Sequence, residues 1–206
     1  MRITLEKISK KFNYEWIFRQ VDYTFESGNA YVFLGANGSG KSTLMQIVAG
    51  NLLPTSGNVN FVEGKNEISQ DLIYRHVSIS APYLELIEEF TLAEILEFHR
   101  KFKPFRDSLD DKQIIEITGL SRVKNKPIRY FSSGMKQRVK LTLAILSDTR
   151  AVLLDEPASN LDKQGVEWYQ QLVGSYSDDR IFIVCSNSQS HEYSFCRNEL
   201  QIGDFK

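Results

Sequence analysis

The sequence predicts an α/β protein built around a parallel β-sheet with helices packed against it. Residues 151–154 and 181–185 are apolar throughout, and a strand with no polar face is typical of a parallel sheet that is covered on both sides. Residues 164–173 lie between these runs and carry apolar residues at helical spacing, which predicts the crossover helix that joins parallel strands. A glycine-rich loop at residues 35–40, which follows an apolar run at 30–34, predicts a third buried strand.

The first 30 or so residues have the alternating pattern of antiparallel strands. They are rich in aromatic residues, and Ser27-Gly28 predicts a turn. A second turn is predicted at residues 54–57, with a returning strand over 58–62. Together these segments predict a small antiparallel β lobe over about residues 1–30 and 57–80.

The middle of the chain predicts a helical lobe over about residues 83–150. Thr91 followed three residues later by Glu94 matches a capping box, and apolar residues recur at helical spacing after it. Further helices are expected over residues 110–120 and 134–146. The rest of the chain forms the core, so we expect one domain over residues 1–206 with these two lobes attached.

Composition excludes several classes of protein. The 206 residues carry 25 Lys+Arg against 26 Asp+Glu, a formal net charge of −1. A chain this balanced has no global positive field for a nucleic-acid backbone, so we expect no nucleic-acid partner. No apolar run reaches the roughly 18–20 residues of a membrane helix, and the N-terminus has no charged-then-apolar leader pattern. We therefore expect a cytoplasmic protein.

Residues 35–42 match the pattern G-x-x-x-x-G-K-[ST] of a phosphate-binding loop. Glycines let successive backbone N–H groups point at phosphate oxygens, and the following helix adds its positive N-terminal end. Lys41 can reach the β- and γ-phosphates as a point charge, and the Ser42 hydroxyl can bind Mg²⁺. The candidate nucleotide ligands here are Gly35, Ala36, Asn37, Gly38, Ser39, Gly40, Lys41, Ser42 and Thr43. A chance match occurs in on the order of one chain in a hundred, and the strand before the loop and the helix after it argue against chance.

Two adjacent acids, Asp155 and Glu156, end the apolar run at 151–154. Ligands of open α/β sheets bind beyond the carboxyl ends of the strands, so both acids should face the nucleotide. Adjacent side chains point in different directions. We expect Asp155 to bind Mg²⁺ or its water shell and Glu156 to orient and polarise an attacking water. A solvated pair of acids at a strand end is the alternative.

The order and spacing of further motifs resemble those of ABC-type ATPases over essentially the whole chain. Phe131-Ser132-Ser133-Gly134-Met135 is similar to the signature loop of that family, and Arg138, shortly after it, stands 17 residues before Asp155. Ser159-Asn160-Leu161-Asp162 resembles the loop after the catalytic strand. Phe12 stands 29 residues before Lys41, where the family places the aromatic residue that stacks on adenine; Tyr14 and Trp16 are alternatives.

This resemblance implies a P-loop NTPase core of the RecA-like type, with an N-terminal antiparallel β lobe and an inserted helical lobe that carries the signature. It implies ATP and Mg²⁺ as cofactors and ATP hydrolysis as the reaction. Two such domains, as a homodimer or a heterodimer, would enclose two ATP molecules. The loop of Lys41 in one domain would face Ser132 and Gly134 in the other.

Two positions depart from the family pattern. Where the family has a glutamine this chain has Pro82, which offers no side-chain oxygen for Mg²⁺. Where the family has a histidine after the last buried strand, this chain has Asn187. Asparagine can hydrogen-bond to a γ-phosphate but carries no charge. We therefore expect either slow turnover or substitution by other groups. The neighbouring candidates for substitution are Glu85, Glu88 and Gln189, with His191 as a displaced histidine or a surface residue.

The leading functional hypothesis is the ATP-hydrolysing subunit of an ABC transporter. A separate integral membrane permease would carry the substrate, and this chain would lie peripherally on the inner face of the cell membrane. Its docking groove is expected between the lobes, near residues 83–98. The alternative is a soluble ABC-type ATPase of DNA repair or translation, which usually has two ATPase domains, coiled-coil insertions or basic arms. A small P-loop kinase would leave the motifs at Ser132 and Asp162 unexplained.

Overall fold

The computed structural model describes all 206 residues. Two sheets organise the chain. The first is antiparallel, with strand order β2-β1-β4-β5, and the second is parallel throughout, with order β6-β7-β8-β3-β9. The strands are β1 (Arg2–Phe12), β2 (Glu15–Glu26), β3 (Asn29–Leu34), β4 (Ser56–Glu63), β5 (Asn66–Glu67), β6 (Val77–Ser80), β7 (Ala151–Asp155), β8 (Ile181–Ser186) and β9 (Asn198–Gln201).

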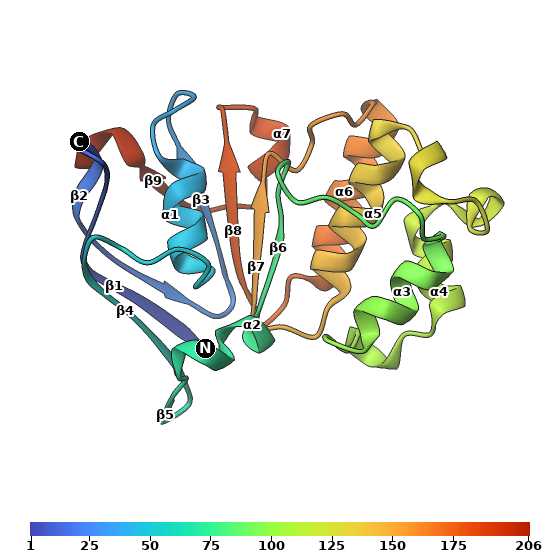
Figure 1. The fold of residues 1–206 in the computed structure, drawn as a ribbon, viewed down its shortest axis with the longest axis horizontal. Helices are drawn as coiled ribbons and strands as arrows, with labels where there is room; N and C mark the ends of the chain where they lie inside the picture. Colours follow the sequence, from blue (N-terminus) through green and yellow to red (C-terminus); the bar gives the residue numbers. More distant parts are fainter.

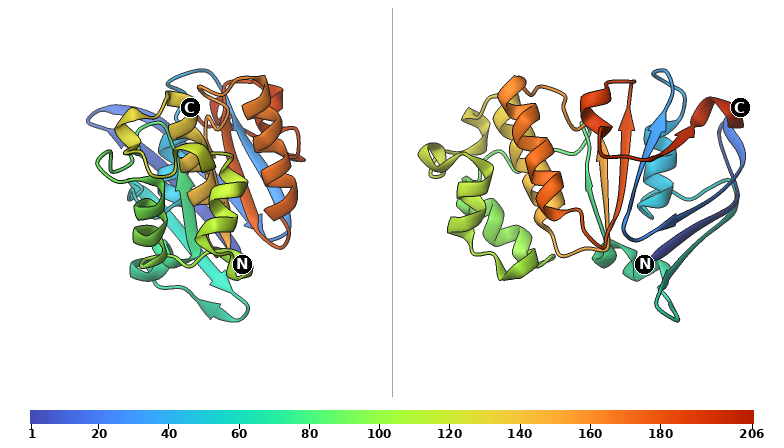
Figure 2. Two further views of the ribbon diagram at one scale, coloured as in Figure 1. Left: turned by 90° about the vertical axis from the view of Figure 1, so that its right-hand side faces the viewer. Right: turned by 180° about the vertical axis from the view of Figure 1, so that it is seen from behind.

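The helices divide between the two faces of the parallel sheet. Figure 1 shows α1 between the antiparallel and parallel sheets, while α5 and α6 pack on the other side and α3 and α4 lie beyond them. Figure 2 shows the same division from behind. The helices are α1 (Lys41–Val48), α2 (Ile73–His76), α3 (Leu92–Arg100), α4 (Asp111–Thr118), α5 (Ser133–Leu146), α6 (Lys163–Tyr176) and α7 (Ser190–Tyr193).

Alternate residues of the central strands pack into two separate hydrophobic cores, one on each face of the parallel sheet. In β3, Phe33 faces the core shared with α1 and the antiparallel sheet, whereas Val32 faces the core shared with α3–α6. In β8, Ile183 and Val184 divide in the same way. Successive strand residues point to opposite faces, so a strand with a core on both sides must be apolar at every position. The predicted α/β class and its buried strands are confirmed.

Strand β6 corrects the expected limits of the β lobe. The sequence pattern predicts Val77–Ser80 as part of that lobe, but the strand pairs in parallel with β7 at the edge of the core sheet. Four residues with serine at alternate positions carry too weak a pattern to distinguish the two sheets. Strand β9 was not predicted, because Asn198–Gln201 is polar at three of its four positions.

The capping box predicted at Thr91 is present. The Thr91 hydroxyl accepts a hydrogen bond from the Glu94 N–H at 3.3 Å, and Glu94 Oε2 accepts one from the Thr91 N–H at 2.7 Å. Helix α4 begins with a second capping box, between Asp110 and Gln113. Each box satisfies two N–H groups that a helix end leaves without partners, which fixes where the helices of the lobe begin.

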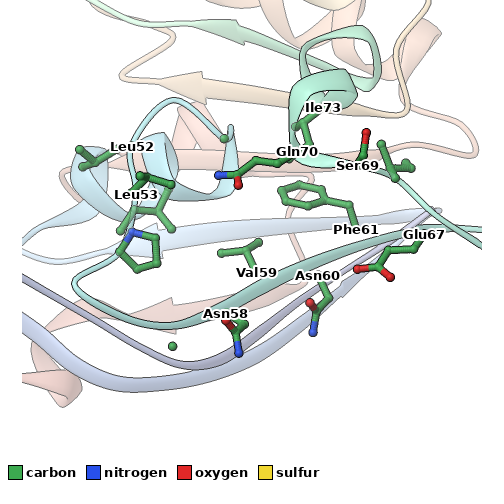
Figure 3. A pocket seen from close by; sticks show the side chains of 15 residues that line it. Leu52, Leu53, Asn58, Val59, Asn60, Phe61, Glu67, Ser69, Gln70 and Ile73 are labelled. Atoms are coloured by element: carbon green, nitrogen blue, oxygen red, sulfur yellow. The ribbon is translucent and has the colours of Figure 1, made fainter.

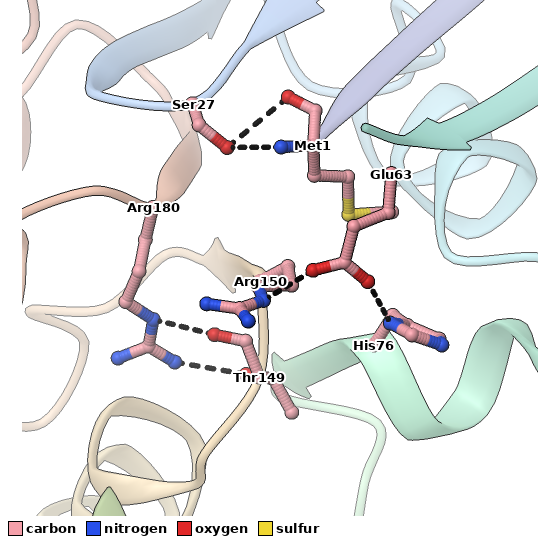
Figure 4. A network of polar contacts seen from close by, with 7 residues as sticks. All are labelled: Met1, Ser27, Glu63, His76, Thr149, Arg150 and Arg180. Carbon is pink, nitrogen blue, oxygen red and sulfur yellow. Dashed lines mark hydrogen bonds and ion pairs between the residues drawn. The ribbon is translucent and has the colours of Figure 1, made fainter. Parts of the chain in front are cut away.

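Polar contacts tie the amino ends of the parallel strands together (Figure 4). Arg180, directly before β8, is fully buried and donates to the carbonyl oxygens of Ile145, Ser147 and Thr149 at 2.6 to 3.0 Å. Glu63, at the end of β4, pairs with Arg150 at 2.6 Å and with His76 at 3.3 Å. These contacts lie at the edge of the sheet opposite the glycine-rich loop, so they stabilise the frame on which the site is built.

His99 makes the stability of the fold depend on pH. Its ring stacks on Phe105 with centroids 5.1 Å apart and hydrogen-bonds to the Ser147 hydroxyl at 2.7 Å. Burial, with the positive charges of Lys103 and Arg100, lowers the pKa of His99 from 6.5 to about 4. Between these values the unfolded chain binds the proton and the folded chain does not, so stability falls as the pH drops through this window.

Replacing His99 with phenylalanine should reduce that dependence. One group contributes a slope of at most about 1.4 kcal/mol per pH unit. We expect urea unfolding to show a larger loss of stability between pH 7 and pH 5 in the parent chain than in His99→Phe. Equal losses in both proteins would show that His99 does not titrate with folding.

The helices of this chain are all too short or too polar to span a lipid bilayer.

Candidate nucleotide-binding site

Three loops that carry predicted site residues leave the parallel sheet at one edge. In the strand register Leu34 pairs with Ser186, and Asp155 pairs with Cys185. The glycine-rich loop after β3, the acids after β7 and Asn187 after β8 therefore emerge side by side. Residues far apart in the sequence meet here because parallel strands end at the same edge.

The glycine-rich loop connects Leu34 to α1 and packs against β2. Gly40 has φ 106°, a left-handed conformation, and a Cβ there would come within 2.6 Å of Ile17 Cγ2. Only glycine fits this close approach without strain. The Ser39 hydroxyl is buried and has no hydrogen-bond partner within the chain. An unpaired buried hydroxyl in a glycine-rich loop at the start of a helix suits a phosphate oxygen as its partner.

Lys41 is buried and points back into this loop. Its ammonium donates to the carbonyl oxygens of Gly35 at 2.6 Å and Ala36 at 3.1 Å, and to Asn187 Oδ1 at 2.6 Å. The positive charge therefore lies at the centre of the loop. It can bind the terminal phosphates of a nucleotide from this position.

Asn187 bridges Lys41 and Glu156. Its oxygen accepts from Lys41, and its Nδ2 donates to Glu156 Oε1 at 2.9 Å. The structure thus places Asn187 between the phosphate loop and the paired acids. His191 is exposed on α7, so the displaced-histidine alternative is wrong for this structure.

Asp155 lies next to Ser42 at the start of α1. Burial raises the pKa of Asp155, and the nearby charge of Glu156 raises it further, while a hydrogen bond with Ser42 and the charge of Lys41 oppose the rise. No group of three or more His, Cys, Asp or Glu residues is arranged to hold a metal ion. A hydroxyl and one carboxylate fit Mg²⁺, which takes few protein ligands and completes its shell with phosphate oxygens and water.

The segment after β6 brings a residue to the site that sequence reasoning missed. Pro82 itself contributes only its carbonyl oxygen, which accepts from Lys140 at 3.4 Å. The phenol of Tyr83 approaches Gln46 of α1 and Asp155: burial, with the charge of Asp155, raises the pKa of Tyr83 to about 12. The ring remains 46% exposed, so Tyr83 places a neutral hydroxyl at the rim of the site. Its approach to Asp155 depends on the path of the loop after Pro82, which spacing along the chain does not give.

The other acids of this segment do not join the chain of contacts from Lys41 to Glu156. Glu88 pairs with Lys136 of α5, and Glu85 lines a hollow with Pro82, Lys136 and Lys140. The predicted substitutes Glu85 and Glu88 therefore belong to the contact between this segment and α5. The N–H of Gln189, the third candidate, donates to the Ser186 hydroxyl at 3.2 Å.

The aromatic candidates for adenine stacking lie on the hairpin between β1 and β2. Phe12 is half exposed, and the Lys10 ammonium lies 4.9 Å from its ring centre. The cations of Lys11 and Arg19 lie 5.3 Å and 4.8 Å from the ring centre of Trp16, whereas Tyr14 at the tip is fully exposed. The hairpin stands beside the glycine-rich loop, because Ile17 of β2 packs against Gly40.

Ser132 and Gly134 lie away from Lys41 within one chain. The exposed Ser132 caps α5 by accepting from the Met135 N–H at 3.3 Å. Helix α5 packs against β6 and β7, and β6 is separated from β3 by three strand spacings, roughly 14 Å. A Cβ on Gly134 would come within 2.8 Å of the Asn160 carbonyl oxygen, so the signature loop touches the loop after β7. One chain alone does not bring Ser132 to its own phosphate loop.

A separate hollow lies at the opposite end of α1 (Figure 3). It encloses about 400 Å³ between the segment after α1, β4 and α2, and its lining includes Leu52, Val59 and Phe61. Helix α1 spans about 12 Å between this hollow and the glycine-rich loop. It therefore plays no part in the site described above.

Comparison with known proteins agrees with this geometry. Residues 18–159 match the family model described as ABC transporter. The chain is 28% identical over 165 residues to the uncharacterized ABC transporter ATP-binding protein YcbN of Bacillus subtilis (strain 168), a match that covers 80% of this chain and 54% of YcbN. It is 27% identical over 190 residues to the lantibiotic transport ATP-binding protein SrtF of Streptococcus pyogenes, covering 90% of this chain and 79% of SrtF.

Solved structures share the fold. A dimeric post-hydrolysis state of the ATP-binding cassette MJ0796, bound to ADP and phosphate, superposes with a TM-score of 0.82 at 21% identity, covering 98% of this chain and 95% of the other. The family match extends over more than half of the chain and includes the phosphate loop, the signature loop and the paired acids. The chain therefore belongs to the ABC transporter family, as an ATP-hydrolysing nucleotide-binding domain.

Proposed function

We propose that this chain is the ATP-binding and hydrolysing subunit of a transporter whose substrate pathway lies in a separate membrane permease. The observation that carries the proposal is the continuous chain of contacts from Lys41 through Asn187 to Glu156, beside Asp155. It joins a phosphate-binding cation to a carboxylate through a single amide side chain, so that a base lies beside the loop that would hold the γ-phosphate. This is the arrangement that phosphoryl transfer to water requires.

In this proposal each group has one role. The backbone N–H groups of the loop 35–40 and the ammonium of Lys41 hold the phosphates. Ser42 and Asp155 bind Mg²⁺, which would neutralise charge on the phosphates. Glu156 accepts a hydrogen bond from the attacking water and polarises it, and Asn187 keeps the carboxylate beside the loop.

The site is completed by a second nucleotide-binding domain. Ser132 and Gly134 are far from Lys41 in the same chain, and Ser132 is exposed at the amino end of α5. A hydroxyl and free N–H groups at a helix start bind anions well. A second domain, either another copy or a related chain, would place these groups against the γ-phosphate held by Lys41.

The permease would dock in a groove between the core and the helical lobe. This groove encloses about 270 Å³ between β6, α3 and α5. Its lining includes the apolar side chains of Leu84, Leu86 and Leu143 and the charged residues Glu85, Lys103 and Lys140, with one more positive charge than negative. Such a surface fits a short amphipathic helix with an apolar face and an acidic residue. The subunit would then lie peripherally on the inner face of the membrane.

Membrane association tests the proposal directly. We expect the tagged chain, expressed in its own cell, to sediment with membranes and to copurify with one integral membrane protein after detergent extraction. Leu86→Asp should release it from the membrane with ATP binding unchanged. Leu53→Asp is the matched control, because Leu53 is exposed on the opposite hollow. If Leu86→Asp and Leu53→Asp release the chain equally, or if the parent chain never sediments, the proposal fails.

Replacing Asn187 with histidine should raise the turnover of ATP. Histidine can add a charge-assisted contact to the γ-phosphate in the transition state, which asparagine cannot. We expect kcat to rise about tenfold in Asn187→His. In Asn187→Ala, which cuts the contact with Glu156, we expect kcat to fall. If neither variant changes kcat in a steady-state assay, Asn187 is not part of the catalytic machinery.

A further inference from the structure

We infer that Glu192 is a positioning residue: its buried carboxylate fixes the turn that carries Glu156 and the loop that carries Asn187 in one arrangement. Glu192 lies on the short helix α7 and is only 2% exposed. Its Oε1 accepts from the Ala158 N–H at 3.1 Å, and its Oε2 accepts from the Ser186 hydroxyl. The inference rests on the proposed role of the site in ATP hydrolysis.

These two contacts connect the two segments that carry the proposed site residues Glu156 and Asn187. Ala158 is two residues after Glu156, and Ser186 directly precedes Asn187. One carboxylate therefore bridges the turn after β7 and the loop after β8. The hydrogen bond from Asn187 Nδ2 to Glu156 Oε1, at 2.9 Å, is made between the same two segments. Its geometry depends on their spacing.

Both segments are strained and need such support. Glu156 has φ 46° and Ser188 has φ 69°, and left-handed conformations are unfavourable for residues other than glycine. Such conformations persist where several contacts over-determine them. Three hydrogen bonds support the turn of Glu156. The Glu156 N–H donates to the Cys185 carbonyl oxygen at 3.0 Å, and Gln137 Nε2 donates to the Pro157 carbonyl oxygen at 2.9 Å. The third is the bond from the Ala158 N–H to Glu192.

Glu192 is itself held by the core. The buried hydroxyl of Tyr169, on α6, donates to the Glu192 carbonyl oxygen at 2.8 Å. The Glu192 N–H donates to the Gln189 carbonyl oxygen at 2.9 Å. Burying a carboxylate costs free energy, and burial raises the pKa of Glu192 against the opposing effect of its hydrogen bonds. An apolar residue at 192 would avoid that cost but would leave the Ala158 N–H and the Ser186 hydroxyl without their partner.

The contacts of Glu192 do not include the phosphate loop. Lys41 is held by the carbonyl oxygens of Gly35 and Ala36 and by Asn187, and the loop is anchored between β3 and α1. Loosening the turn of Glu156 should therefore impair the chemical step much more than nucleotide binding. This split between kcat and Kd separates a positioning role from a general contribution to stability.

The test uses the full chain with Glu192→Leu and Glu192→Gln. Leucine removes both acceptors; glutamine keeps an oxygen for the Ala158 N–H and offers its amide N–H to the Ser186 hydroxyl oxygen. We expect kcat for ATP to fall about tenfold or more in Glu192→Leu, with the ATP Kd within about twofold of the parent. Glu192→Gln should retain most of the activity. If Glu192→Leu does not fold, Ser186→Ala replaces it in the test. This variant removes only the hydrogen bond between the Ser186 hydroxyl and Glu192, and it should lower kcat by a smaller factor.

The matched control is Thr149→Val. Thr149 is also buried, and its hydroxyl accepts from Arg180 at 2.8 Å, but it lies at the amino end of β7, away from the site. We expect this variant to unfold at lower denaturant concentration with kcat unchanged. The inference is overturned if Glu192→Leu folds and turns over ATP at the parent rate. It is also overturned if Thr149→Val lowers kcat as much, since loss of stability would then explain the effect.

Hydrogen–deuterium exchange gives an answer independent of activity. In Glu192→Leu the amide of Ala158 should exchange at least about tenfold faster, while amides of α1 keep their protection. Unchanged protection at Ala158 would overturn the inference. If the parent chain hydrolyses no ATP, the proposed function fails, and the exchange result alone decides whether Glu192 holds the turn.

Discussion

Replacing Glu156 with glutamine is expected to stop ATP hydrolysis and to leave the chain as an ATP-bound dimer. Glutamine keeps an Oε1 that can accept from Asn187 Nδ2, as Glu156 does at 2.9 Å, so the shape of the site is preserved. It lacks the negative charge that polarises the attacking water. It also removes the repulsion between the carboxylate and the γ-phosphate, which should favour the closed dimer.

Size-exclusion chromatography with light scattering, with and without ATP, measures the dimer. Adding Ser132→Arg should block it, because Ser132 is exposed and an arginine would place bulk in the closed interface. A Glu156→Gln variant that hydrolyses ATP at the parent rate would falsify the catalytic assignment. An inactive variant that stays monomeric would keep that assignment and indicate that the working partner is a different chain.

Much of the fold could be predicted because its strands are buried on both faces. Residues 151–154 and 181–185 have no polar position, and the structure places them at the centre of the parallel sheet. The helix start at Thr91 was predictable because the local side chains of Thr91 and Glu94 cap it. The two edge strands of the parallel sheet have neither a continuous apolar run nor a capping residue that would identify them in the sequence. Val77–Ser80 and Asn198–Gln201 join the sheet only through pairing with strands distant in the sequence.

The site was predictable where a motif encodes it and unpredictable where packing does. The glycine-rich loop was identified from its motif and the paired acids from their place after a buried strand, whereas Asn187 was identified from the resemblance to ABC-type ATPases. Tyr83 reaches Asp155 only because of the path that the chain takes after Pro82. Glu192 contacts a residue 34 positions away, and Gln137 contacts one 20 positions away. No periodic pattern in the sequence links such pairs, since each contact forms only once the parallel sheet and the helices beside it have been assembled.

Lys41→Ala should abolish measurable binding of triphosphate without unfolding the chain. The ammonium is the one cationic side chain that the structure places inside the glycine-rich loop, where it donates to Gly35, Ala36 and Asn187. Charge-assisted hydrogen bonds contribute roughly 1.5–3 kcal/mol each, so losing those to the phosphates should raise the ATP Kd at least about 100-fold. The loop should persist, because backbone hydrogen bonds such as Ser39 N–H to the Ala36 carbonyl oxygen, at 3.1 Å, do not involve the side chain.

Lys103→Ala is the matched control for that variant. Lys103 is also a largely buried lysine that donates to a backbone carbonyl oxygen, that of Val77 at 2.7 Å, and burial lowers its pKa. It lies between α3 and the amino end of β6, at the edge of the sheet opposite the glycine-rich loop. Calorimetric titration with ATP should therefore show parent affinity in Lys103→Ala and no measurable binding in Lys41→Ala, with the same circular dichroism spectrum for both. If the affinity of Lys41→Ala equals that of the parent, phosphate binding does not occur at residues 35–42, and the roles proposed for Ser42, Asp155 and Glu156 lose their basis.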